Sequence, residues 1–121
     1  MQYPTISEYV KANQDASDNL DMSTEVTYVE LNEAIIDEFG VKYSKDGRKL
    51  LKAPKELDGT YSIKEGVRII CDKAFFYCRS LTDIVIPDSI TNIGDSVFWG
   101  SNLPNDLKEE LISRFGDKIF G

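Results

Sequence analysis

The side chains that most often carry catalysis are scarce in this sequence of 121 residues. It contains no histidine, which is the usual general base near neutral pH and the usual zinc ligand. A serine nucleophile would therefore depend on a lysine partner. Neither of the common glycine-rich phosphate-binding motifs occurs. These observations argue against an enzyme, and no cofactor is expected.

Cys71 and Cys78 are the two cysteines, seven residues apart. A disulfide framework needs more cysteines and a metal site needs further ligands, so we expect two buried free thiols. The carboxylates of Asp88, Asp95 and Asp106 could offer oxygen ligands to calcium, but their spacing is not that of an EF-hand loop. No metal site is therefore predicted.

Three aromatic residues, Phe76, Tyr77 and Trp99, have the types best suited to binding a partner. Phe76 and Trp99 each follow a phenylalanine of an apolar pattern, Phe75 and Phe98, and should therefore point outward. Tryptophan and tyrosine are enriched at the residues that dominate protein interfaces. We predict that the three form one exposed patch; the alternative is that they pack beneath the N-terminal segment or a C-terminal helix.

A second candidate surface is the outer face of the predicted strands, which carries Ser62, Asp83 and Val85. Repeat proteins expose an extended face that is made of equivalent positions in successive repeats, and they often bind partners there. This strand face is the alternative to the aromatic patch.

Both candidate surfaces lie in a segment that occurs twice, 23 residues apart, in the ranges 61–81 and 84–104. The matching pairs are Ile63 with Ile86, Val67 with Ile90, Ile70 with Ile93, Ala74 with Val97 and Phe75 with Phe98. A fixed period of this length is typical of a solenoid, in which each unit buries its apolar face against its neighbour. We therefore predict that Phe75 and Phe98 stack on each other in the core.

The region before the repeats is expected to be partly helical. Thr5 and Glu8 have the spacing of a capping box, which favours a helix over residues 5–20. The β-branched stretch 26–31 could be a strand or could open a helix. We favour a helix over 33–39, with Asn32 as its N-cap and Gly40 just past its end.

A hairpin should connect this region to the repeats. Asp46-Gly47 lies between two apolar segments, 41–43 and 50–51, and Asp-Gly is a strong turn signal because glycine tolerates positive φ. A further turn is expected at Asp58-Gly59, which leads into the first repeat.

The pattern changes again at the C-terminal end. Leu107, Leu111, Ile112 and Phe115 share one face of a predicted helix that ends before Gly116. Pro104, at the start, suits a first helical turn. We expect this amphipathic helix to cover the open end of the last repeat, because terminal solenoid units need caps.

Charge and hydropathy limit the partners. The length fits one domain, and the net charge of −7 repels phosphate backbones, so neither nucleic-acid binding nor an anionic membrane surface is expected. The sequence has no apolar stretch long enough to span a bilayer and no signal-peptide pattern at its start. The expected location is cytoplasmic; secretion or cell-surface display is the alternative if a leader has been removed.

The repeats resemble the BspA-like leucine-rich repeats of bacteria. The residues that carry the resemblance are Ile63, Val67, Ala74, Phe75, Cys78, Leu81, Ile84, Ile86, Pro87, Ile90, Ile93 and Gly94. The resemblance covers about residues 60–102, and it implies a leucine-rich repeat fold. Members with many repeats are often surface proteins that bind host proteins or other bacteria. This chain has two such repeats, and Ser101 replaces the cysteine of the second.

We therefore expect an α+β fold built around a short right-handed leucine-rich-repeat solenoid of two 23-residue repeats. Its parts are an N-terminal helical region at 1–40, a hairpin at 41–59, the repeats at 60–102 and a capping helix at 103–121, all in one compact domain. The expected function is non-enzymatic binding of a protein partner. The alternatives are a structural or self-associating unit and a small acidic regulatory or inhibitory protein.

Overall fold

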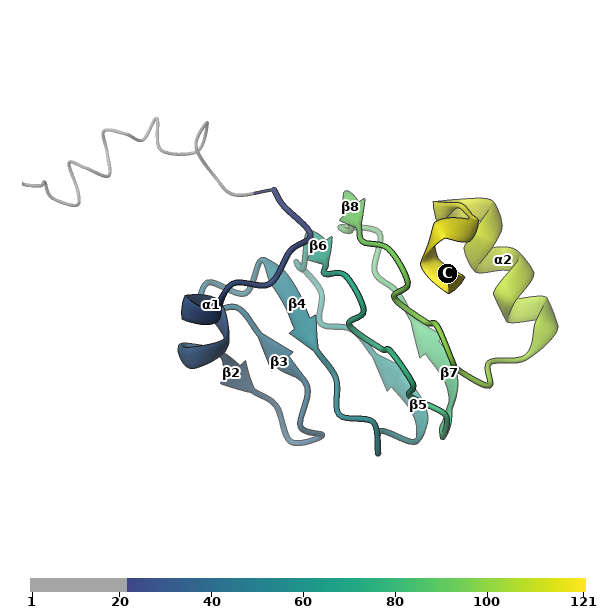
Figure 1. The fold of residues 1–121 in the computed structure, drawn as a ribbon, viewed down its shortest axis with the longest axis horizontal. Helices are drawn as coiled ribbons and strands as arrows, with labels where there is room; N and C mark the ends of the chain where they lie inside the picture. Colours follow the sequence, from purple (N-terminus) through teal and green to yellow (C-terminus); the bar gives the residue numbers. More distant parts are fainter. Residues whose placement is uncertain (1–21) are drawn as a thin grey trace, which may run out of the picture.

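The computed structural model describes residues 22–121. The helix expected at 5–20 lies outside the described residues. Two β-sheets form the centre of the described part, and helices lie at its two ends (Figure 1). Among residues 22–121, no helix is both long enough and apolar enough to cross a membrane.

The larger sheet has five strands in the order β2-β3-β4-β6-β8. Its strands are β2 (Ile35–Ile36), β3 (Lys42–Tyr43), β4 (Lys49–Lys52), β6 (Ile69–Ile70) and β8 (Asn92–Ile93). The first three pair antiparallel, whereas β4, β6 and β8 pair parallel. The smaller sheet pairs β5 (Gly59–Ser62) with β7 (Leu81–Val85) in parallel. Each repeat therefore contributes one strand to each sheet.

The repeats stack with equivalent positions in register. Tyr61 pairs with Ile84, and Ile70 pairs with Ile93. Turn segments form a third side of each repeat and are also joined by backbone hydrogen bonds. The amides of Lys73, Phe75 and Tyr77 donate to the carbonyl oxygens of Asp95, Val97 and Trp99, over 3.1, 2.9 and 2.8 Å. These ladders satisfy buried backbone groups on every side of the core.

Phe75 and Phe98 fill the space between the three sides. Both are fully buried, and their rings stack with centroids 5.4 Å apart and planes 14° apart, so the predicted core pair is confirmed. The aromatic series continues in both directions, to Tyr61 at 6.2 Å from Phe75 and to Phe120 at 5.7 Å from Phe98. One line of rings therefore runs along the stacked repeats.

The helix predicted over 33–39 is wrong. Helix α1 spans Tyr28–Asn32, so Asn32 is its last residue rather than its N-cap. The N-cap is Thr27, whose hydroxyl accepts from the Glu30 N–H while the Glu30 carboxylate accepts from the Thr27 N–H. Ile35 and Ile36 instead form β2, because their backbone pairs with Tyr43 and Lys42 of β3. The strand alternative for 26–31 is also wrong.

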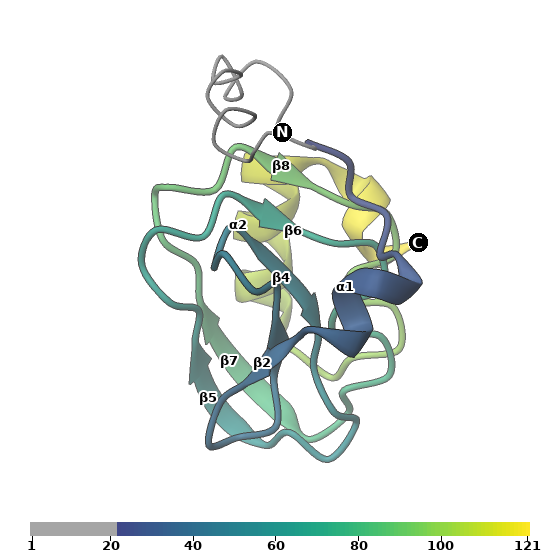
Figure 2. The same cartoon turned by 90° about the vertical axis from the view of Figure 1, so that its left-hand side faces the viewer.

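An ion pair with a buried lysine joins α1 to the sheet. The Lys49 side chain of β4 is fully buried, and its Nζ lies 2.9 Å from Glu30 Oε2. Burial alone would raise the pKa of Glu30, but hydrogen bonds from Lys49 and Thr27 and the charge of Lys49 hold that pKa below its ordinary value. Figure 2 shows α1 beside β2 at this end of the molecule.

The hairpin prediction is confirmed. Strands β3 and β4 pair antiparallel across a turn in which Gly47 has φ +78°. Asp46 closes the turn, since its Oδ1 accepts from the Ser44 hydroxyl at 2.8 Å and from the Arg48 N–H at 3.1 Å. Gly59, at φ +70°, then turns the chain into β5 as expected.

The C-terminal region contains more than a helix. Helix α2 (Asn105–Phe115) follows Pro104 and ends at Gly116, which has φ +90°. The 3-10 helix η2 (Asp117–Phe120) then returns to the turn ladder: the amides of Ser96 and Phe98 donate to the carbonyls of Lys118 and Ile119, both over 2.8 Å. Residues 117–120 thus repeat the backbone role of 95–98, which the sequence analysis missed.

Both cysteines are buried thiols that form no disulfide, as predicted. Burial raises the pKa of the Cys78 thiol to about 11. Its Sγ lies 3.4 Å from the carbonyl oxygen of Pro54, which can accept a hydrogen bond from it.

Candidate functional site

Phe76, Tyr77 and Trp99 lie together on the turn side of the stacked repeats. The rings of Phe76 and Trp99 stack, with centroids 5.1 Å apart and planes 16° apart. Tyr77 meets both edge-on, at 4.8 Å from Phe76 and 4.9 Å from Trp99. The three rings form one cluster, here called the aromatic cluster.

The turn backbone positions these rings. The Tyr77 N–H donates to the Trp99 carbonyl at 2.8 Å, which holds the two turns in register. Tyr77 adopts φ +59°, which is uncommon for a residue with a side chain, and Gly100 adopts φ +80°. A Cβ on Gly100 would lie 2.7 Å from Tyr77 Cδ1, so glycine at 100 leaves the space that the Tyr77 ring occupies.

The cluster remains partly accessible. Trp99 is 40% exposed, whereas Phe76 and Tyr77 are half-buried. Gly121 lies against the pyrrole edge of the Trp99 ring, since a Cβ there would be 2.8 Å from Cδ1. A partner could therefore contact Trp99 without any rearrangement of the described residues.

Cationic side chains surround the aromatic cluster. The Nζ atoms of Lys52 and Lys73 lie 5.9 and 5.4 Å from the centroid of Phe76. Lys55 Nζ and the Arg79 guanidinium lie 5.8 and 4.9 Å from the centroid of Tyr77. Cations at these distances are attracted to the ring faces. The sequence analysis did not identify them, because they come from separate segments and follow no period.

The alternative strand face has different chemistry. Ser62 and Val85 are register partners across β5 and β7, and Asp83 pairs with Thr60. Ser62, Asp83 and Val85 are exposed, with Val85 at 51%. The Asp83 carboxylate accepts from the N–H of Ile84 at 2.8 Å. This face offers a single large apolar side chain, so it has less area for a desolvated contact than the aromatic cluster.

An exposed apolar surface lies around α1 and β2, and the sequence analysis missed it. Its members are Tyr28, Val29, Leu31, Ile35, Ile36 and Phe39, which are between 39% and 82% exposed. They come from α1, β2 and the turn after β2. The incorrect helix over 33–39 would have turned part of this set toward the core.

No candidate metal site is found among the described residues 22–121. Within 22–121, no group of three or more histidine, cysteine, aspartate or glutamate side chains is arranged to hold a metal ion. The site therefore offers aromatic surface and positive charge, which suit binding.

Comparison with known proteins agrees with this architecture. The family model described as "BspA type Leucine rich repeat region (6 copies)" matches residues 59–121. The structure is similar to the crystal structure of a leucine-rich repeat protein from Eubacterium ventriosum ATCC 27560, with a TM-score of 0.53 and 28% sequence identity. That similarity covers 58% of this chain and 19% of the other, so the chain spans about a fifth of the length of that protein. No curated protein matches the sequence.

Proposed function

Since the chain belongs to the BspA type leucine-rich repeat family, we propose that it binds a protein partner through the aromatic cluster of Phe76, Tyr77 and Trp99. Leucine-rich repeat domains generally serve as protein-interaction modules. The proposal assigns this chain binding rather than catalysis, and it places the contact on the turn side rather than on the strand face.

The observation that carries the proposal is the stacked pair of Phe76 and Trp99, of which Trp99 is exposed. Large aromatic rings on the surface of a soluble domain are costly unless they are used, and clustered rings desolvate efficiently when a partner covers them. Backbone hydrogen bonds join the two turns and the two rings stack on each other, so we expect binding to cost little further side-chain entropy.

The test uses peptides of about 12 residues, selected from a random library against the full chain. Trp99→Ala should weaken the selected peptides by about thirtyfold, because a central aromatic residue contributes about 2 kcal/mol or more. Val85→Ala is the matched control on the strand face and should leave affinity unchanged. Peptides that bind Trp99→Ala as well as the parent, while Val85→Ala weakens them, would move the site to the strand face.

Self-association is a second candidate function, and the exposed apolar surface at Tyr28–Phe39 favours it. Contiguous apolar patches on a monomer often mark association sites. Light scattering over a range of concentrations measures the molar mass directly. If this surface joins two copies, Ile36→Lys should convert a dimer to a monomer; a parent that is monomeric at every concentration contradicts this candidate.

The helical end of the chain supports a further part of the proposal. We propose that α2 and η2 together cap a short solenoid. Leu111 and Ile119 are buried, and Phe120 packs on Phe98 at the end of the ring series. Helix α2 lies at one end of the molecule (Figure 1). Such a cap would keep the last repeat from exposing its apolar interior.

A further inference from the structure

A groove of about 450 Å³ lies beside the aromatic cluster. Three apolar residues, Val26, Leu31 and Leu51, line it together with three lysines, Lys42, Lys52 and Lys73. Lys52 and Lys73 are also the two lysines whose ammonium groups lie over Phe76. Lys52 and Lys73 therefore connect the groove to the aromatic cluster, and the groove is here called the lysine groove.

The lysines of this surface repel one another. Burial lowers the pKa of Lys52, and the charges of Lys55, Lys73 and Lys42 lower it further, although Cys78 acts in the opposite direction. The ion pairs within residues 22–121 join Arg48 to Asp46 and Lys49 to Glu30, and none of these four lysines takes part in one. A chain with a net charge of −7 thus gathers four lysines at this place.

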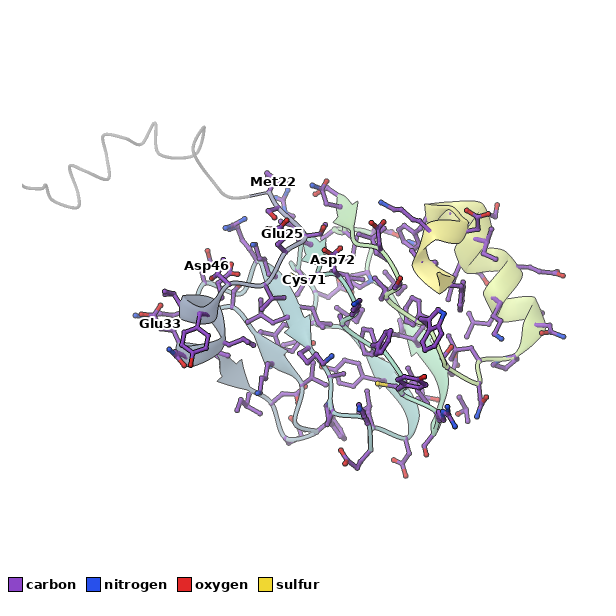
Figure 3. All side chains as sticks on the ribbon, viewed as in Figure 1. Met22, Glu25, Glu33, Asp46, Cys71 and Asp72 are labelled. Atoms are coloured by element: carbon purple, nitrogen blue, oxygen red, sulfur yellow. The ribbon has the colours of Figure 1, made fainter. Side chains whose placement is uncertain are left out.

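The one acidic residue that lines the groove is already engaged. Asp72 Oδ1 accepts from the Thr24 hydroxyl and from the Asp95 N–H, both over 2.9 Å. The Asp72 N–H donates to the Thr24 carbonyl at 2.7 Å, and Figure 3 shows Asp72 beside the segment that carries Met22 and Glu25. Asp72 therefore fixes this segment along the groove and does not pair with the lysines.

We infer that the partner inserts an acidic peptide segment with an apolar anchor residue into the lysine groove. The anchor would contact Val26, Leu31 and Leu51, while flanking carboxylates pair with the lysines and the peptide continues over the Phe76–Trp99 stack. Opposite charge at the rim speeds association and excludes basic partners. A long polyphosphate fits less well, since the remaining surface of this acidic chain would repel it. The inference rests on the proposed function.

The first measurement asks what the selected peptides have in common. They should be enriched in aspartate and glutamate around a leucine or an aromatic residue. Replacing the carboxylates of one such peptide by the corresponding amides should lower its affinity about tenfold or more. Added salt should lower the affinity of the acidic form and leave that of the amide form unchanged. Trp99 is the single tryptophan, so its fluorescence reports binding without a label.

The second measurement uses a matched pair of lysines. Lys73 and Lys64 are both exposed, and each ammonium lies 5.4 Å from an aromatic centroid, of Phe76 and Tyr43 respectively. Lys73→Glu should weaken the acidic peptide about tenfold or more, whereas Lys64→Glu should change its affinity by less than about twofold. Melting temperatures show whether each variant folds, and Lys73→Gln replaces Lys73→Glu if the latter does not.

Several outcomes would overturn the inference. Neutral or basic peptides that still require Trp99 would refute the acidic partner but leave the proposed function standing. If an oligothymidylate binds as tightly as the peptide, the partner of the groove is a nucleic acid rather than a protein segment. Binding that appears only after Glu8, Asp15, Asp18 and Asp21 are changed to their amides would assign the groove to the N-terminal segment of the chain itself. A dimer that Lys73→Glu dissociates would assign it to a second copy.

Discussion

At the residue scale, pairs of neighbouring side chains have opposite roles. Phe75 and Phe98 are fully buried, whereas Phe76 and Trp99, which directly follow them, stack on the outside. In each turn, two consecutive residues therefore point to opposite sides, one into the core and the other to the surface. A substitution at one member of each pair should therefore change stability and at the other should change binding.

Truncation of the core ring should be severe. Phe98→Ala leaves a cavity between Phe75 and Phe120 and should cost about 3–5 kcal/mol of unfolding free energy. This is a large share of a typical stability of about 5–15 kcal/mol. Urea unfolding measures it, and Val85→Ala on the surface serves as the control. A Phe98→Ala protein as stable as this control would mean that the ring does not support the core.

The two thiols should be inert in the folded protein. Cys71 and Cys78 are both buried, and the pKa of Cys78 is raised to about 11, so little reactive thiolate forms at mildly alkaline pH. A colourimetric disulfide reagent should label neither cysteine quickly in native buffer and both in denaturant. Rapid labelling of the native chain would contradict the burial described above.

At the element scale, the N-terminal helix depends on a charge that the sheet buries. The Glu30 side chain both caps α1 and pairs with Lys49 of β4. Lys49 is fully buried, so the negative charge of Glu30 offsets an ammonium that water does not reach. The Glu30 side chain therefore both caps α1 and connects it to the sheet.

Glu30→Gln should destabilise the chain by about 2–3 kcal/mol, because hydrogen bonds to charged groups are among the strongest in proteins. The pKa of Glu30 is depressed in the folded state, so its contribution is fully present above its ordinary value of 4.5 and is lost as pH falls below it. The unfolding free energy of the parent, measured in urea, should therefore fall more steeply with decreasing pH than that of Glu30→Gln. Parallel pH profiles would show that the pair contributes nothing.

The elements that the sequence predicted correctly are those with local signals. The apolar positions of the repeats recur at a constant spacing, and Asp46-Gly47 marks the hairpin. For α1, the capping-box spacing of Thr27 and Glu30 was present, but the β-branched residues around it left strand and helix both open. In the folded chain Glu30 also pairs with Lys49, a contact distant in sequence that local patterns do not reveal.

At the scale of the whole molecule, the unpredicted features are those that only folding assembles. The lysine groove combines Lys42 of β3, Lys52 of β4 and Lys73 of a turn, which share no sequence spacing. Residues 117–120 occupy the same place in the turn ladder as residues 95–98. Helix α2 stands where a repeat would have a strand, so the sequence between the two segments does not show the repeat pattern. Sequence alone therefore predicted the aromatic residues of the candidate site and not its charge.

The C-terminal elements should be required for folding. A chain that ends at Asn102 lacks α2 and η2 and would expose Val97 and Phe98, which those elements cover in part through Ile119 and Phe120. Such a chain should aggregate or lose its cooperative thermal transition, which circular dichroism and light scattering detect. A soluble, cooperatively melting chain of this length would show that the last repeat does not need its cap.

The most direct test of the central claim is to map the contact by nuclear magnetic resonance. A selected peptide is titrated into the ¹⁵N-labelled full chain, and amide and indole shifts are followed. The account predicts that the largest changes fall on Phe76, Tyr77 and Trp99, including the single indole N–H of the chain. Changes centred instead on Ser62, Asp83 and Val85, with the indole signal unmoved, would contradict it.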